Sequence, residues 1–297
     1  IKNELEQELA RREFWRFCLY MDQDFFKARK KILKPVADAF QQIEENKLEL
    51  LYVGMPPRTG KSNITSLFTA WVLGRNPTES IMRNTVTQKL YSKFSSDIRD
   101  IMQGKTHDGR YLDIFNVSFA SDKVDGWKLE SSQHGVSYFG AGVGGSIIGF
   151  GCTKAAILDD SIKNAEEAMS ETILDKKWDW YTSTHKSRLE KGCPEIHIAT
   201  RWSKNDIPGR LTQQNLFDDE KAKKIVIPAL DQEGNSYPVQ ESNIDGEALV
   251  DVADLPPLGT KTFEPSSKYF EPDNEFEVSE KLFENSMLRL EFDRSGY

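Results

Sequence analysis

The chain has 297 residues, 38% of which are hydrophobic, and a formal net charge of −8. This length and composition suffice to bury a sizeable core, so we expect one large α/β domain with a small appendage. The negative charge argues against strong independent binding to nucleic acid. Three Cys and four His residues show no metal-ligand spacing, and the odd number of Cys argues against a disulfide framework.

Residues 1–46 form the first predicted segment, which is helix-rich and amphipathic. Apolar side chains from Leu9 to Leu19 cluster on one face, which we expect to pack against the core rather than to bind a partner. A basic run follows within this segment, formed by Lys27, Arg29, Lys30, Lys31 and Lys34. We interpret the run as a solvated helix face, with contact to a phosphate backbone as the alternative.

An apolar run at residues 50–53 predicts a strand, and it breaks at Gly54 into the sequence Met55-Pro56-Pro57-Arg58-Thr59-Gly60-Lys61-Ser62. Gly-Lys-Ser after a strand predicts a phosphate-binding loop, in which backbone N–H groups and the Lys hold phosphates and the Ser hydroxyl binds Mg²⁺. Met55 stands where the usual pattern has Gly, so the motif alone is also compatible with a surface turn. Apolar residues recur every three or four positions over 63–73, which predicts a helix.

A second motif follows the apolar run at residues 154–158, which ends in Asp159 and Asp160. The pattern is typical of a buried parallel strand that delivers acids to the carboxyl edge of a sheet. Asp159 is predicted to support Mg²⁺, and Asp160 to orient and deprotonate the attacking water. The alternative is that the two acids open the next helix, and it fits Asp160 alone better than the pair.

Further strands are predicted on both sides of these acids. Residues 195–199 read as a buried strand, so Thr200 and Arg201 should emerge at the same sheet edge. Residues 79–87 read as an additional strand between the loop and the acids, the feature that separates ATPases with a catalytic carboxylate from simpler nucleotide-binding folds. Residues 224–228 read as the last strand of the core, and residues 279–290 as a helix.

Together these motifs resemble the ATPase part of the large subunit of the tailed-bacteriophage terminase, the motor that packages DNA into capsids. The resemblance covers about residues 35–230 and is carried by residues 56–62, by the Gly-rich stretch 144–151 that leads into the two acids, and by residues 199–202 and 206–211. It implies a P-loop NTPase of RecA-like fold with an additional strand and a catalytic carboxylate. In the implied fold, the sheet is mostly parallel and flanked by helices, and a small C-terminal linker subdomain follows it.

In that family another residue often replaces the first loop Gly, and Arg follows Pro-Pro, as here. By resemblance, Arg58 would sense the γ-phosphate, and Thr200 with Arg201 would link hydrolysis to movement. The predicted catalytic residues are therefore Arg58, Lys61, Asp160 and Thr200; the predicted nucleotide contacts are Pro57, Arg58, Thr59, Gly60, Lys61, Ser62, Asn63 and Arg201; and the predicted Mg²⁺ contacts are Ser62 and Asp159.

Two positions depart from the family pattern. The second acid is often Glu in the family and is Asp160 here, where the shorter side chain would place water less well. Many relatives carry Arg in the Gly-rich loop where this chain has Phe150, so no trans-acting arginine is transferred to that position. By elimination the candidates for such an arginine are Arg83, Arg99, Arg110 and Arg210, each of which we expect to be solvated or salt-bridged at the surface.

The resemblance implies ATP hydrolysis that drives double-stranded DNA into a procapsid, with ATP and Mg²⁺ as cofactors. It also implies a homo-oligomeric ring and, as partners, the portal protein and the small terminase subunit. Acidity is concentrated at one end, because residues 228–297 contain 16 Asp and Glu against 5 Lys and Arg, which leaves 31 acidic and 34 basic residues elsewhere. A ring needs only weak DNA contacts per subunit, because several subunits act together.

Two alternatives stay open. One is a nucleotide-binding assembly or docking module with little hydrolysis. The other is a related helicase-type ATPase, which is less favoured because the remaining residues show no second ATPase-like half. We expect an N-terminal helical segment at 1–46, an ATPase core at 47–230 and an acidic linker subdomain at 231–297. No strands ending in spaced acids follow residue 230, so we predict no nuclease activity. The sequence has no membrane-length apolar run and no signal-peptide pattern, and its Cys residues favour a reduced cytosol. The resemblance implies the host cytoplasm, with the chain transiently at the procapsid portal vertex.

Overall fold

The computed structural model describes residues 2–124, 126–147 and 149–228, and three short strands in the C-terminal part of the chain. The chain divides into two compact units, Ile1–Pro228 and Ala229–Tyr297. The predicted site residues all belong to the first unit. Most of the predicted linker subdomain, residues 231–297, lies outside the described residues.

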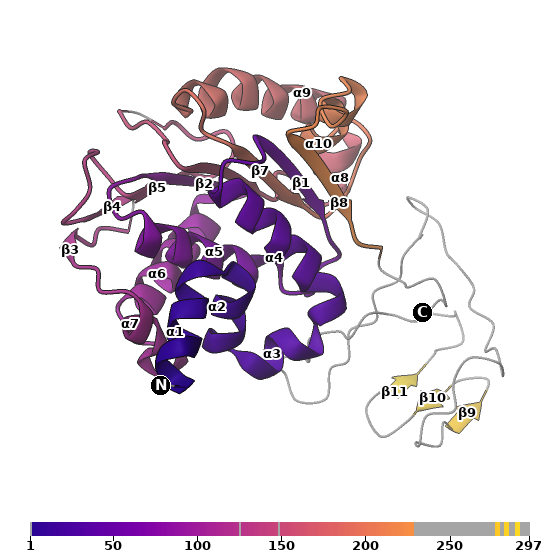
Figure 1. Ribbon diagram of the computed structural model, residues 1–297. Coiled ribbons are helices and arrows are strands. Elements are labelled where there is room, and N and C mark those ends of the chain that lie inside the picture. The colour runs from indigo at the N-terminus through magenta and orange to yellow at the C-terminus, as the bar shows by residue number, and fades with distance from the viewer. Residues whose placement is uncertain are drawn as a thin grey trace. The chain divides into compact units, whose positions relative to one another are not determined.

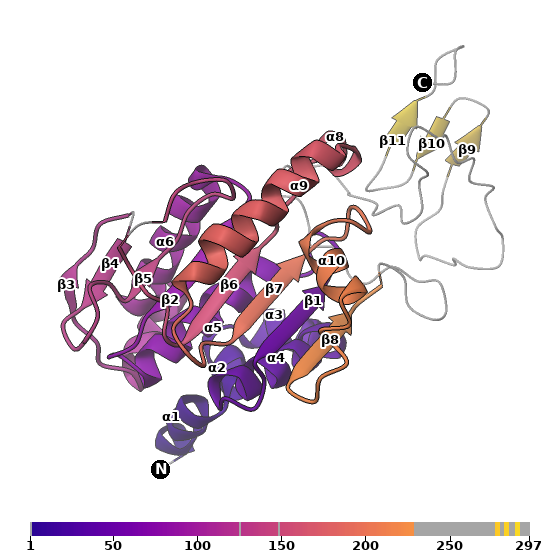
Figure 2. The ribbon, with the colours of Figure 1, turned by 90° about the horizontal axis from the view of Figure 1, so that it is seen from above.

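An eight-stranded sheet forms the centre of the first unit (Figures 1 and 2). Its order is β3-β4-β5-β2-β6-β7-β1-β8, and every pairing from β5 to β8 is parallel, while β3, β4 and β5 pair antiparallel with one another. The strands are β1 (Leu50–Gly54), β2 (Ile81–Thr85), β3 (Phe119–Ser121), β4 (Gly126–Leu129), β5 (Tyr138–Phe139), β6 (Ala155–Asp159), β7 (Glu195–Ala199) and β8 (Ala222–Val226).

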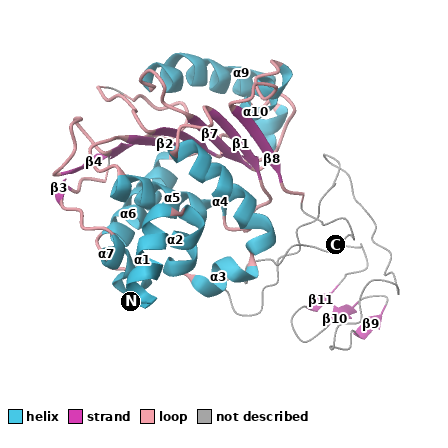
Figure 3. Ribbon diagram, in the orientation of Figure 1, coloured by secondary structure: helices cyan, strands magenta, loops and turns pink. Residues whose placement is uncertain are grey.

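Helices cover both faces of this sheet, with α1 to α7 on one side and α8 to α10 on the other (Figures 1 and 3). They are α1 (Lys2–Arg12), α2 (Phe14–Met21), α3 (Gln23–Ala28), α4 (Lys30–Glu44), α5 (Lys61–Arg75), α6 (Gln88–Met102), α7 (Arg110–Ile114), α8 (Ala165–Met169), α9 (Glu171–Trp180) and α10 (Ile207–Gln213). All residues of β2, β6 and β7 are buried, as expected for parallel strands covered on both faces. The predicted α/β class with a mostly parallel, helix-flanked sheet is confirmed, and it is compatible with a RecA-like fold.

The strands predicted at residues 50–53, 79–87, 154–158 and 195–199 are present, as is the helix predicted at 63–73. One interpretation was wrong. The strand that separates β1 from β6 in space is β7, while β2, at the position given to the additional strand, lies on the far side of β6. Sequence periodicity identifies a strand but not its neighbours, because strand order is set by long-range packing.

The N-terminal helices pack on α5, which is buried at every position from Ile64 to Leu73. The ring of Phe14 lies 5.4 Å from that of Phe68 and 5.3 Å from that of Trp71. The indole Nε1 of Trp71 donates to the carbonyl of Ala10 at 3.0 Å. The apolar face of the first helices therefore covers the helix that begins at Lys61.

In the second unit, the described residues form an antiparallel three-stranded sheet of β9 (Glu277–Ser279), β10 (Leu282–Glu284) and β11 (Arg289–Glu291). The prediction of a helix at 279–290 was therefore wrong. The sequence Leu288-Arg289-Leu290-Glu291-Phe292 alternates apolar and polar residues, which is the period of a strand rather than of a helix. Among the described residues, no helix has the length and apolar character needed to cross a membrane.

Candidate functional site

Three of the predicted segments meet at the carboxyl edge of the sheet. Since β1, β7 and β6 are parallel neighbours, with β7 in the middle, the segments that follow them lie side by side (Figure 2). Backbone hydrogen bonds fix this edge: the Met55 N–H donates to the Ala199 carbonyl at 3.1 Å, and the Asp160 N–H donates to the Ile198 carbonyl at 2.8 Å.

The side chain of Lys61 joins the three segments. Its Nζ lies 3.2 Å from Oδ2 and 3.3 Å from Oδ1 of Asp160, and it donates to the Thr200 hydroxyl at 2.6 Å. The Thr200 N–H in turn donates to Asp160 Oδ1 at 2.8 Å, and the Thr200 hydroxyl donates to the Met55 carbonyl at 3.3 Å. We call Lys61, Asp160 and Thr200 the Lys61 cluster.

Burial sets the electrostatics of this cluster. Lys61 is only 7% exposed, so its charge is stabilised chiefly by Asp160. Burial raises the pKa of Asp160 above its ordinary value, and the neighbouring Asp159 acts in the same direction, while Lys61 and the Thr200 N–H oppose the rise. The cluster thus holds a carboxylate that accepts a proton more readily than an exposed Asp does.

The loop before Lys61 contains two left-handed backbone positions. Arg58, which is exposed, has φ of 62°, and Gly60 has φ of 102° as the residue that precedes α5. A Cβ on Gly60 would also lie 2.9 Å from the ring of Phe25 on α3. Asp160 itself has φ of 49°. Left-handed conformation is costly for a side chain such as that of Arg58, and such strain is concentrated at functional sites.

The remaining loop residues surround the start of α5. Thr59 is buried, and its hydroxyl donates to the Pro56 carbonyl at 2.8 Å, which closes the turn. Pro57 is exposed, and Ser62 and Asn63 are half-buried in the first helical turn. The first N–H groups of a helix have no partner within the helix, so this end of α5 suits an anion.

Arg201 does not join the Lys61 cluster. Its Nε donates to Asp206 Oδ2 at 3.2 Å, and one terminal nitrogen donates to the Ser203 carbonyl at 2.9 Å. Asp206 also caps α10 by accepting from the Gly209 N–H at 2.9 Å. Arg201 therefore links the end of β7 to the start of α10.

Asp159 forms a buried ion pair with Arg83 of β2. Two nitrogens of the guanidinium, Nε at 3.1 Å and the nearer Nη2, donate to the same carboxylate oxygen, Oδ2. Arg83 is fully buried, so its expected surface position was wrong. A signal for burial was present, because a charged residue inside a buried strand requires a buried partner, but the sequence does not say which acid that partner is.

The other candidate arginines are held elsewhere. Arg210 pairs with Asp175 at 2.6 Å, Arg110 pairs with Asp108 at 3.1 Å, and Arg99 donates to the Asp122 carbonyl. Phe150, the residue in the Gly-rich loop, is 36% exposed and lies against Phe139.

The donor set suits Mg²⁺ bound together with a nucleotide. Among the described residues, no cluster of three or more His, Cys, Asp or Glu side chains is placed to hold a metal ion. Mg²⁺ in phosphate-transfer sites takes one or two protein oxygens and completes its shell with phosphates and water. The Ser62 hydroxyl is one such oxygen. Oδ1 of Asp159 is a second, because it accepts no hydrogen bond within the described part of the chain.

Sequence reasoning missed the contact of α3 with the loop. Phe25 lies against Gly60, and the guanidinium of Arg29 stacks 4.2 Å above the Phe25 ring. Arg29 is half-buried, and its buried Nε has no hydrogen-bond partner among the residues that the structure describes, so it does not belong to a solvated face. Lys27, Lys30 and Lys31 are exposed as expected. No local pattern marks Phe25, since its contact depends on where α3 packs.

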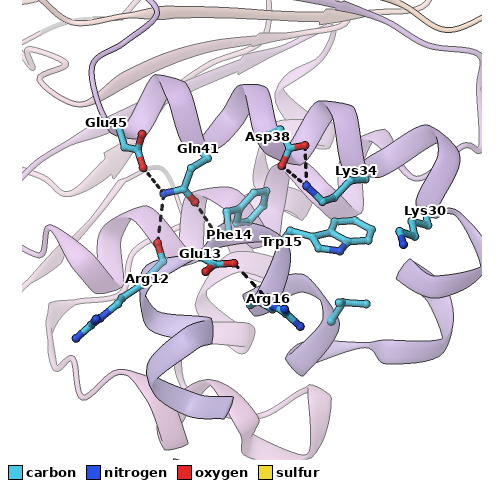
Figure 4. Close-up of a pocket in the computed structure, with 11 residues that line it drawn as sticks. Arg12, Glu13, Phe14, Trp15, Arg16, Lys30, Lys34, Asp38, Gln41 and Glu45 are labelled. Carbon is cyan, nitrogen blue, oxygen red and sulfur yellow. Dashed lines mark hydrogen bonds and ion pairs between the residues drawn. The ribbon is translucent and has the colours of Figure 1, made fainter. Parts of the chain in front are cut away.

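A separate cavity of about 460 Å³ lies between α2 and α4 (Figure 4). Gln41 crosses it, accepting from the Phe14 N–H at 2.7 Å and donating to the Arg12 carbonyl and to Glu45. No residue of the predicted site lines this cavity.

No protein-family model matches this chain, and no curated protein sequence matches it significantly.

Proposed function

We propose that the chain is a Mg²⁺-dependent P-loop ATPase, the motor part of a terminase large subunit that drives double-stranded DNA into a procapsid. The observation that carries this proposal is the Lys61 amine, held between the Asp160 carboxylate and the Thr200 hydroxyl. Asp160 and Thr200 are 99 and 139 residues from Lys61 in the sequence. A Gly-Lys-Ser loop, an acid and a polar strand end have been brought to one edge of a parallel sheet, the edge where α/β folds bind ligands.

Strand order supports the ATPase class. With β7 between β1 and β6, the acid is one strand away from the loop, which leaves room for a water molecule between Asp160 and a bound phosphate. Thr200, at the end of the intervening β7, contacts both Lys61 and Asp160. The remainder of the proposal, DNA translocation in a ring, rests on the resemblance of the three motifs to the terminase family.

Phosphate binding would change the partners of Lys61. In the resting state the ammonium is neutralised by Asp160, so a bound triphosphate competes with that carboxylate for the amine. The N–H groups at the start of α5 and the amine then hold the phosphates, and Asp160 is released from its ion pair. Asp160 remains fixed by the Thr200 N–H at 2.8 Å.

The released Asp160 is suited to act as the base. It accepts a hydrogen bond from the attacking water and takes its proton, and burial, which raises its pKa, makes it a better acceptor. Ser62 and Asp159 would hold Mg²⁺, which would supply positive charge to the phosphate oxygens. Arg58, which is exposed on the loop, approaches the γ-phosphate. Arg201 transmits a movement of the end of β7 to α10, because it is hydrogen-bonded to Asp206, the residue that caps α10.

The test is ATP hydrolysis by the purified chain with Mg²⁺, with and without double-stranded DNA. Lys61→Ala should lower turnover on the order of 10²-fold or more, because phosphoryl transfer depends on positioning and charge stabilisation. Lys93→Ala serves as the matched control, since Lys93 is exposed on α6 and pairs with Asp97 at 2.7 Å. Equal rates for Lys61→Ala and the unmodified chain would refute the proposal.

One observation favours a second candidate, an assembly or docking module that binds nucleotide and rarely hydrolyses it. Both oxygens of Asp160 are engaged by Lys61, and Asp is shorter than the Glu common in the family. If ATP bound at high protein concentration is recovered intact after hours, the docking module is the better account. Cleavage of plasmid DNA by the pure chain with Mg²⁺ or Mn²⁺ would contradict the predicted absence of nuclease activity.

A further inference from the structure

The Arg83 guanidinium contacts three elements near the proposed nucleotide site, which are β6, α5 and α6. Its Nε and Nη2 donate to Oδ2 of Asp159, at the end of β6. Its Nη1 donates to the Ser66 hydroxyl on α5 at 3.0 Å. The guanidinium also lies 3.9 Å from the centre of the Phe94 ring on α6. Three elements are therefore fixed by one fully buried cation.

Sheet stability alone does not explain this arrangement. Strands β2 and β6 already pair in parallel along their whole length, from Ile81 with Ala155 to Thr85 with Asp159. A buried ion pair adds little to this, because the cost of removing two charges from water offsets their attraction, and apolar residues of similar size are often more stabilising. What a buried pair does provide is a defined position for each charged group.

The position that Arg83 defines is that of Asp159 relative to α5. Nε and Nη2 of Arg83 both donate to Oδ2 of Asp159, which prevents the carboxylate from rotating. The lone pairs of Oδ1 accept no hydrogen bond from the described residues. Ser66 is four residues after Ser62 on the same helix, and residues at this spacing share a helix face. Arg83 thus connects the acid of β6 to the helix that carries the Ser62 hydroxyl.

We propose that Arg83 is a positioning residue for Mg²⁺: it holds Asp159 through Oδ2 and Ser66 so that Oδ1 and Ser62 remain available to the ion or its water. This inference rests on the proposed nucleotide site. Groups that orient a metal-binding carboxylate without touching the metal commonly change metal affinity by 10–100-fold when removed.

The test measures binding rather than turnover. The affinity of the purified chain for a fluorescent ADP analogue is determined by anisotropy, once with Mg²⁺ and once with EDTA, and the ratio of the two affinities is the Mg²⁺ enhancement. Arg83→Lys keeps the charge but loses the forked geometry, and should reduce the enhancement on the order of tenfold while leaving the affinity in EDTA unchanged. A purely structural role would instead lower both affinities together.

Ser66→Ala provides a second test if Arg83→Lys fails to fold, because it removes only the hydroxyl on α5 that accepts a hydrogen bond from Nη1 of Arg83. It should also reduce the enhancement, by a smaller factor. The matched controls are Arg99→Lys and Ser95→Ala on α6, whose hydrogen bonds to the carbonyls of Asp122 and Val124 lie outside the site, and both should retain the full enhancement.

The outcomes separate the two proposals. If the unmodified chain binds no ADP under either condition, the proposed function fails. If it binds ADP with an enhancement that both Arg83→Lys and Ser66→Ala keep or increase, the nucleotide site stands and the role of Arg83 is refuted. A selective loss of enhancement in either variant, with the controls unaffected, establishes Arg83 as a positioning residue.

Discussion

Thr200 connects the loop and the acid through one hydroxyl and one N–H group. Its hydroxyl accepts from Lys61 at 2.6 Å and approaches the Met55 carbonyl at 3.3 Å. Thr200→Val keeps the shape and the N–H donor to Asp160 but removes the hydroxyl. We expect it to lower ATP turnover about tenfold, because a hydrogen bond to a charged group contributes about 1.5–3 kcal/mol.

The measurement is steady-state ATP hydrolysis of Thr200→Val beside Thr200→Ser, which retains the hydroxyl and should recover most of the rate. An unchanged rate in Thr200→Val would show that the hydroxyl has no part in orienting Lys61.

Gly60 offers a second prediction for a single residue. Its φ is 102°, and a Cβ at this position would lie 2.9 Å from the Phe25 ring, so the loop and the ring would have to move apart. Gly60→Ala should lower the free energy of unfolding by about 1 kcal/mol or more and also weaken ATP binding, because the loop must move away from Phe25.

Gly192→Ala is the matched control. Gly192 has a similar φ of 83°, but in the described part of the chain no atom beyond its two sequence neighbours lies within 4 Å of the place that its Cβ would take. Urea unfolding should therefore show a loss of stability in both variants, while equilibrium nucleotide binding should change in Gly60→Ala alone. Unaltered binding in Gly60→Ala would separate the loop from nucleotide recognition.

Single residues differed in how well they could be predicted. Lys61, Asp160 and Thr200 each follow a strong strand signal, so their shared edge could be expected from parallel strands alone. The partner of Asp159 could not, because Arg83 reaches it only through the register that sets Thr85 beside Asp159. Phe25 was missed for the same reason, since helix packing rather than sequence spacing brings it to Gly60.

At the scale of elements, residues 181–186, which follow α9, cover the carboxylate of Glu195 on the sheet. Glu195, which begins β7, accepts from the Tyr181 hydroxyl at 2.9 Å and pairs with Lys186 at 3.1 Å. His185 and His197 each place Nε2 3.7 Å from the Glu195 carboxylate. The Nδ1 atom of His185 is hydrogen-bonded to the Asn84 side chain at 2.8 Å, and His185 is fully buried.

This packing makes stability depend on pH. Burial lowers the pKa of His185 to about 4, although Glu195 opposes the shift, so the folded state keeps the ring neutral. Between pH 6.5 and about 4 the unfolded chain binds a proton that the folded chain does not, and stability falls by roughly 3 kcal/mol as pH falls. Burial also acts to raise the pKa of Glu195, but the neighbouring His197 ring, with Nε2 3.7 Å from the carboxylate, and Lys186 lower it, so the contribution of Glu195 is lost only at still lower pH.

Urea unfolding between pH 7 and pH 4 tests this prediction. His185→Gln cannot titrate, and its stability should vary less over this interval than that of the unmodified chain. An equally steep acid dependence in His185→Gln would assign the effect to other groups.

For the whole molecule, the class of fold followed from the apolar runs, but the order of its strands did not. An apolar run such as residues 155–158 identifies a buried strand but not its place in the sheet. The insertion of β7 between β1 and β6 depends on contacts between residues far apart in sequence, and it places Thr200 between Lys61 and Asp160. In the C-terminal unit the sequence alternation around Leu290 predicted a strand, and the helix interpretation neglected it.

We propose that the Lys61 cluster hydrolyses ATP and that several subunits act together on DNA. The most direct test is steady-state ATP hydrolysis as a function of protein concentration, with and without double-stranded DNA, for the unmodified chain beside Asp160→Asn. We predict a rate per subunit that rises with concentration or DNA and is abolished in Asp160→Asn. A negligible rate at every concentration, despite ATP binding, or a rate that survives in Asp160→Asn, would contradict the account.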